Sequence, residues 1–183
     1  MATNIKDEFP LVQRVIGVKV HGIRNYMFVV DENMPGGANL ICEVLRRVLL
    51  DLDAKGELPN KDPTLYLQVD NCGENKNKVM FAFLTHLVRL GIFNKIKAGF
   101  LMVAHTHEDV DQMFSTVATH LHNETVVCPD CDSLLHAIKQ AFQNPAHQPQ
   151  VEVLSPLQMF DYTSFYTPHI DPKIHHHQEP HQF

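Results

Sequence analysis

The segment that starts at Asp70 carries oxygen ligands of the kind that Mg²⁺ or Mn²⁺ prefers. Asp70 comes directly after an apolar run at 65–69, which predicts a buried strand, and Asn71 and Glu74 follow it. In an open sheet with helices on its faces, ligand-binding residues collect at the carboxyl end of such a strand. We therefore expect Asp70 to bind the cation, with Asn71 and Glu74 in support. The alternative is a turn in which Asp70 accepts hydrogen bonds from nearby backbone N–H groups.

A second polar segment lies at the start of a predicted helix. Its potential ligands are His105, His107, Glu108 and Asp111. On a helix Asp111 shares a face with His107, four residues before it, and with Glu108, three before it. Capping explains Asp109, because Thr106 and Asp109 resemble a capping box and the helix dipole favours acids in the first turn. We expect Asp111 to lie past that turn, beside an apolar stripe, which makes it the stronger candidate for a metal ligand.

Cysteine spacing offers a third, weaker metal signal. Cys128 and Cys131 have the spacing of half a zinc site, but no second pair accompanies them. His120 and His122 could complete the site, although they also suit the polar end of a helix. The four cysteines of the chain do not form the dense framework of a small secreted domain, so we expect reduced thiols.

Composition and charge restrict the class of protein. The chain has 183 residues, of which 44% are hydrophobic, and a net charge of -6. These values indicate a globular protein with a core, and the negative charge argues against a surface whose main role is to neutralise phosphates. The sequence contains neither a signal-peptide core nor a run of about twenty apolar residues. We expect an intracellular protein, nuclear or cytoplasmic, that is not secreted and has no membrane partner.

Hydrophobic periodicity predicts alternating strands and helices. β-Branched and aromatic residues on both sides of Gly22 predict an antiparallel hairpin over 14–30. Asp132 is a candidate N-cap for the last helix. The order of elements favours an α/β fold with a mixed sheet flanked by helices. The predicted helices cover 39–54, 77–90, 108–122 and 133–142, and the predicted strands after the hairpin cover 65–69, 98–103 and 151–154.

The predicted pattern weakens after residue 143. Residues 1–143 hold most of the periodic elements, whereas 144–183 are rich in proline and histidine and predict a loop-rich C-terminal extension. A hairpin near the chain start without a neighbouring strand leaves a sheet edge exposed. We therefore expect the chain to self-associate.

Several motifs, in order along the chain, resemble an uncharacterised domain family of eukaryotic transposon-derived proteins. The hairpin ending in His21-Gly22 and the terminal Pro180-His181-Gln182-Phe183 belong to this set, and the resemblance covers most of the chain. The longest motifs are Asp70-Asn71-Cys72-Gly73-Glu74-Asn75-Lys76-Asn77, Leu90-Gly91-Ile92-Phe93 and His105-Thr106-His107-Glu108-Asp109-Val110-Asp111-Gln112-Met113-Phe114-Ser115.

That family in turn resembles, more distantly, the RNase H-like fold of DDE transposases and integrases. The resemblance implies an RNase H-like core over 1–143, in which acids hold two metal ions, Mg²⁺ or Mn²⁺. Such a site activates a water or a 3′-hydroxyl for phosphoryl transfer on DNA. Carried over, Asp70 matches the second acid and Asp111 the third, with Glu108 as an alternate ligand.

The first acid of such a site lies on a strand that precedes the hairpin. Here only Asp7 and Glu8 precede it, in a segment without a strand pattern, so we expect the first strand to be missing. The chain is then either a fragment of a longer parent protein, through which it would reach DNA, or a decayed copy. Two functions stay open: metal-dependent DNA cleavage or strand transfer, ancestral and incomplete here, or a catalytically inactive domain that binds proteins or nucleic acid.

Overall fold

The computed structural model describes residues 13–31, 33–59, 63–70, 75–100, 109–123 and 125–170, which form a mixed α/β fold. The contacts divide the chain into two compact units, each with its own sheet. One unit is built from residues within 1–34 and 107–156, and the other from residues within 35–106 and 157–183. In the described part of the chain, no helix combines the length and the apolar character needed to cross a membrane.

The first unit contains a three-stranded mixed sheet. β1 (Arg14–Val20) and β2 (Arg24–Val30) pair antiparallel, as the predicted hairpin requires. Gly22, with φ of 74°, adopts the left-handed conformation that the tight connection needs. β5 (Gln150–Leu154) pairs parallel with β2 on its other side, so the strand order is β1-β2-β5. The predicted strand at 151–154 is confirmed.

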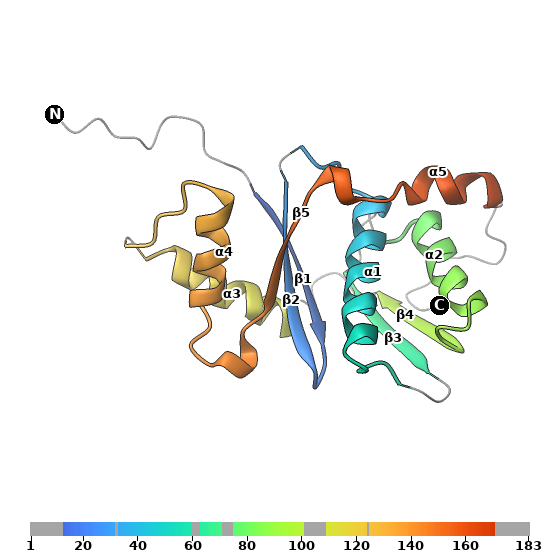
Figure 1. Cartoon of the computed structure of the whole chain (residues 1–183), viewed down its shortest axis with the longest axis horizontal. Helices are drawn as coiled ribbons and strands as arrows, with labels where there is room; N and C mark the ends of the chain where they lie inside the picture. Colours follow the sequence, from blue (N-terminus) through green and yellow to red (C-terminus); the bar gives the residue numbers. More distant parts are fainter. Residues whose placement is uncertain are drawn as a thin grey trace. The chain divides into compact units, whose positions relative to one another are not determined.

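Two helices pack against this sheet, α3 (Asp109–Leu121) and α4 (Cys131–Gln140) (Figure 1). Gly17 of β1 lets α3 approach closely, because a Cβ atom there would lie 2.7 Å from Met113 Cε and 2.9 Å from the Phe114 ring. The helices and the sheet therefore share one core. Its buried members are Met27, Val29, Met113, Val117 and Ile138.

The second unit contains a β-α-β motif. β3 (Thr64–Val69) and β4 (Lys95–Phe100) pair parallel, and α2 (Lys78–Arg89) connects them. The Asn77 side chain caps α2 by accepting a hydrogen bond of 2.8 Å from the Met80 N–H. α1 (Ala38–Ala54) packs beside α2 (Figure 1). The core of this unit contains Cys42, Met80, Phe83, Leu84, Leu87, Phe93, Ala98, Tyr162 and Tyr166.

Two predicted boundaries are wrong. β4 begins at Lys95, three residues before the predicted strand, and residues 101–103 lie outside the described part of the chain. The N-cap of α4 is Asp130 rather than Asp132, because the Asp130 carboxylate accepts the Ser133 N–H at 2.8 Å. The Ser133 hydroxyl in turn accepts the Asp130 N–H at 3.2 Å, which completes a capping box that a cap at Asp132 would not form.

The segment predicted as a loop-rich extension contributes to both units. β5 joins the first sheet, and α5 (Tyr162–Tyr166) packs against α1 and α2 (Figure 1). Tyr162 and Tyr166 are buried in the second core. Because α5 is only five residues long, its sequence is too short for a helical period to be recognised.

Candidate functional site

Asp70 lies directly after β3, at the carboxyl end of the strand, with an exposed side chain. The Asn75 side-chain amide donates a hydrogen bond of 2.5 Å to Asp70 Oδ1. Asn75 itself is buried, with 8% of its surface exposed, so it holds the carboxylate in a fixed orientation. The predicted supporting residues Asn71 and Glu74 lie outside the described part of the chain.

Asp111 is exposed and lies in the first turn of α3. The expectation that it lies past this turn is wrong, since the described helix begins only two residues earlier, at Asp109. The partial positive charge of a helix N-terminus favours a carboxylate here whether or not a metal is bound. His105, His107 and Glu108, the other predicted ligands from this segment, lie outside the described residues.

Asp109 connects the start of α3 to the hairpin. Its Oδ2 atom lies 3.0 Å from Lys19 Nζ and 3.6 Å from His21 Nδ1. The Asp109 side chain is 54% exposed, so its ion pair with Lys19 is worth at most about 1 kcal/mol. The ion pair gives Asp109 a structural role that the sequence did not predict, and the predicted capping partner Thr106 lies outside the described residues.

The two proposed metal ligands belong to different units. Asp70 follows β3 of the second unit, and Asp111 belongs to α3 of the first. Over the described ranges, no group of three or more His, Cys, Asp and Glu side chains is close enough to hold a metal ion. Since five of the predicted site residues fall outside those ranges, the shared metal site stays a prediction.

Cys128 and Cys131 are free, half-buried thiols at the start of α4. Burial, and then the charge of Asp130, raises the pKa of Cys128. Burial, followed by the charges of Asp132 and Asp130, raises the pKa of Cys131. A zinc ligand must be a thiolate, so these surroundings disfavour deprotonation until a cation is present. Zinc at this pair stays a prediction.

Sequence reasoning missed a buried ionic cluster that fastens α5 to α1. This Glu43 cluster consists of Glu43, Arg46, Arg47 and Tyr162. The Glu43 carboxylate is fully buried and accepts hydrogen bonds from Arg46 at 2.6 and 3.0 Å and from Arg47 at 2.7 Å. The Tyr162 hydroxyl of α5 donates a fourth hydrogen bond, at 2.8 Å. Arg46, Arg47 and Tyr162 therefore all donate hydrogen bonds to one carboxylate.

The protonation of Glu43 follows from these contacts. Burial alone would raise the pKa of Glu43, but the hydrogen bonds from Arg46, Arg47 and Tyr162 outweigh it and hold the pKa below its usual value. Burial and the hydrogen bond to Glu43 raise the pKa of Tyr162. Glu43 is thus a carboxylate and Tyr162 a neutral donor at neutral pH. The spacing of Glu43 to Arg46 and Arg47 was a visible signal for ion pairs on one helix face.

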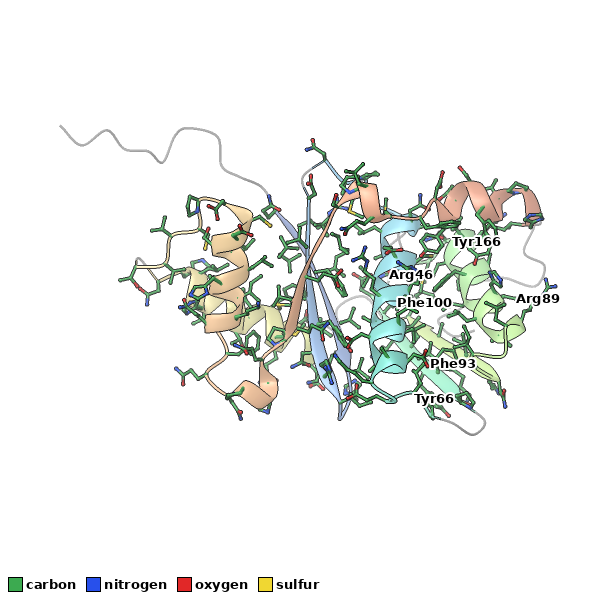
Figure 2. All side chains as sticks on the ribbon, viewed as in Figure 1. Arg46, Tyr66, Arg89, Phe93, Phe100 and Tyr166 are labelled. Carbon is green, nitrogen blue, oxygen red and sulfur yellow. The ribbon has the colours of Figure 1, made fainter. Side chains whose placement is uncertain are left out.

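Three further polar contacts hold α5 in place. Asn39 Oδ1, at the start of α1, accepts the Thr163 N–H at 2.7 Å, while its Nδ2 donates to Asp161 at 3.1 Å. His86 Nδ1 of α2 lies 2.7 Å from the Tyr166 hydroxyl. Arg46 and Tyr166 lie among α1, α2 and α5 (Figure 2). These contacts explain why α5 packs firmly despite its short length.

Comparison with known proteins places the chain in a family. A family model described as a domain of unknown function, DUF7869, matches residues 3–183. The chain belongs to this family. The description of the DUF7869 family gives no activity, ligand or partner, so it neither supports nor opposes a transposon-derived origin. No curated protein and no solved structure matches this DUF7869 chain significantly.

Proposed function

We propose that this DUF7869 chain is a transposon-derived, RNase H-like core whose ancestral activity was metal-dependent cleavage or transfer of DNA strands. The observation that carries the proposal is the position of Asp70. Its carboxylate lies at the carboxyl end of β3, in a parallel β-α-β motif, and is oriented by the buried Asn75. Ligand-binding residues of open parallel sheets collect at this edge.

Asp111 is the second proposed ligand, with Glu108 as its alternate. The Asp111 side chain is exposed at the N-terminus of α3, where it is accessible to a cation. Two carboxylates supply the hard oxygen ligands that Mg²⁺ and Mn²⁺ prefer. A metal ion bound there would stabilise charge on a phosphate and favour deprotonation of an attacking water.

Calorimetric titration with Mg²⁺ and with Mn²⁺ tests the proposal. We expect the wild-type chain to bind the cation and both Asp70→Asn and Asp111→Asn to lose binding, because one site needs both carboxylates. Asp53→Asn is the matched control, since Asp53 is an exposed acid at the end of α1. No binding by the wild-type chain, or loss in only one of the two variants, would contradict a shared site. Loss in both would justify nuclease assays with DNA substrates.

A second function is favoured by apolar side chains near α5. Leu157 is 97% exposed, Phe160 52% and Phe165 46%. Exposed apolar clusters of this kind mark protein-binding surfaces, so a catalytically inactive interaction domain is the alternative. The metal titration separates the two functions, because an interaction domain of this kind needs neither Asp70 nor Asp111.

A further inference from the structure

One face of the β3–β4 sheet has an unusual composition. We call it the Tyr66 face. Side chains alternate between the two faces of a strand, and the other face carries Leu65, Leu67, Val69 and Ile96 into the core of the second unit. The register pairs Thr64 with Lys95, Tyr66 with Lys97 and Gln68 with Gly99, and these six residues form the Tyr66 face.

The Tyr66 face combines an exposed aromatic ring with two cations. Tyr66 is 71% exposed and lies along β3 (Figure 2). Lys97 Nζ lies 5.1 Å from the centre of the Tyr66 ring, and Lys95 is also exposed. The two lysines lie two residues apart, about 6.6 Å along the strand. None of the six residues is acidic, although the chain as a whole has a net charge of -6. The face is therefore a local basic surface on an acidic protein.

The composition also decides what kind of partner the face suits. Parallel strands are usually covered on both faces by apolar packing. Here the outward residues are polar apart from the Tyr66 ring, so an apolar helix is a poor match. A Cβ atom on Gly99 would have no neighbour within 4 Å, so the surface is open at the Gln68–Gly99 pair, which follows the Tyr66–Lys97 pair on this face. A flat surface with an aromatic ring and neighbouring lysines matches a single nucleic-acid strand, whose bases stack and whose phosphates bind cations.

We propose that the Tyr66 face binds single-stranded nucleic acid. An unpaired base stacks on the open side of the Tyr66 ring, and Lys95 and Lys97 bind the adjacent phosphates. Binding needs neither a metal ion nor the carboxylates of Asp70 and Asp111. The inference therefore goes beyond the proposed metal-dependent reaction and can fail or succeed independently of it.

Fluorescence anisotropy in EDTA at low salt tests the inference. The probes are labelled single strands of DNA and of RNA, about 12 nucleotides long, and a DNA duplex of the same sequence. We expect the single strands to bind more tightly than the duplex, and Tyr66→Ala to weaken single-strand binding about 5- to 140-fold. Tyr66→Phe should keep the affinity, because it keeps the ring. Preference for DNA or for RNA would each support the inference and identify the sugar that is recognised.

Lysine variants test the electrostatic part. Lys97→Gln should lower the slope of log affinity against log salt by about 0.7, which is the value for one neutralised phosphate on a single strand. Lys139→Gln, on the exposed side of α4 in the other unit, is the matched control and should leave affinity unchanged. Absence of single-strand binding, duplex binding as tight as single-strand binding, or equal effects of Lys97→Gln and Lys139→Gln would overturn the inference.

Two further measurements distinguish a loss of nucleic-acid binding in Tyr66→Ala from unfolding of the protein and from a change at the metal site. Tyr66 is mostly exposed, so Tyr66→Ala should keep the wild-type circular dichroism spectrum and melting temperature. It should also leave the Mg²⁺ titration unchanged. Altered Mg²⁺ binding by Tyr66→Ala would show that the two surfaces are one site and would overturn their independence.

Discussion

Glu43→Gln is expected to be among the most destabilising single changes in the second unit. Glutamine keeps the shape of the side chain but removes the charge, and its amide group turns N–H donors toward the donors of Arg46, Arg47 and Tyr162. Two guanidinium groups then lie beside each other without a carboxylate between them. The Glu43 cluster thus changes from mutual attraction to repulsion.

The magnitude follows from the burial of each partner. Removing one member of a buried ion pair costs about 3–5 kcal/mol. Glu43 is fully buried, but the Arg46 side chain is 39% exposed and the Arg47 side chain 16%, so water partly solvates the charges that remain. We expect Glu43→Gln to cost about 2–3 kcal/mol of unfolding free energy. Tyr162→Phe, which removes one hydrogen bond to the carboxylate, should cost about 1.5 kcal/mol.

Urea unfolding followed by far-ultraviolet circular dichroism measures these costs. Lys55→Gln is the control, because its ion pair with Asp51 joins side chains that are 34% and 21% exposed and should be worth at most about 0.5 kcal/mol. Hydrogen exchange at 157–170 reports whether α5 opens locally instead of with the whole unit. If Glu43→Gln costs no more than Lys55→Gln, the carboxylate does not hold the cluster together and the reasoning is refuted.

The pH dependence of the same variant gives an independent check. The folded state holds the pKa of Glu43 below its usual value of 4.5. The ionised Glu43 side chain therefore contributes its full share of the unfolding free energy above about pH 4.5, and this contribution is lost as pH falls through the folded-state pKa. The stability difference between wild type and Glu43→Gln should therefore be constant near neutral pH and shrink in acid. A difference that grows as pH falls would contradict the assignment.

Three other predictions concern packing, thiol chemistry and assembly. Gly17→Ala should lower the unfolding free energy, measured with urea, by about 1–2 kcal/mol, because the new methyl group meets α3. The unfolding free energy of Gly99→Ala, whose methyl group meets nothing within 4 Å, should stay within about 0.5 kcal/mol of wild type. Burial raises the pKa of Cys42 to about 12. Alkylation of the native protein at pH 8, mapped by mass spectrometry, should therefore modify Cys42 more slowly than Cys128 or Cys131. Equal rates of alkylation would contradict the burial of Cys42. β1 is an outer strand of its sheet among the described residues, so size-exclusion chromatography with light scattering should detect self-association, and a monomer at high concentration would count against it.

Most helices and strands could be predicted because the residues that determine each of them are close together in the sequence. The apolar stripe of α1 and the β-branched and aromatic residues of the hairpin each span a few residues, and both predicted elements are confirmed. The boundary of α4 was missed since two acids compete as caps, and only Asp130 places Ser133 where it completes a capping box. A two-residue error of this kind arises when several good caps stand in a row.

Long-range contacts were the part that local patterns could not predict. The hydrogen bond between Glu43 and Tyr162 joins residues 119 apart in the sequence, and nothing near Glu43 indicates that α5 will cover it. The pairing of β5 with β2 is similar, because a strand of five residues can pair with many others. For the candidate site, the sequence correctly placed Asp70 at the end of a strand, but its fixed orientation depends on Asn75, whose burial becomes apparent only in the fold.

Asp70 directly follows β3, the strand that carries Tyr66, so an effect of Mg²⁺ on nucleic-acid binding can be tested. Asp70 follows Tyr66 by four residues, about 13 Å along the strand, so a nucleic-acid strand bound on the Tyr66 face can extend to the carboxylate. Carboxylate and phosphate repel each other unless a cation lies between them. Mg²⁺ at a concentration that does not screen the lysines should therefore raise the single-strand affinity of the wild-type chain but not that of Asp70→Asn, with Asp53→Asn behaving as wild type. If Mg²⁺ instead weakens binding equally in all three, it acts only as a competing counterion, and Asp70 takes no part in holding nucleic acid.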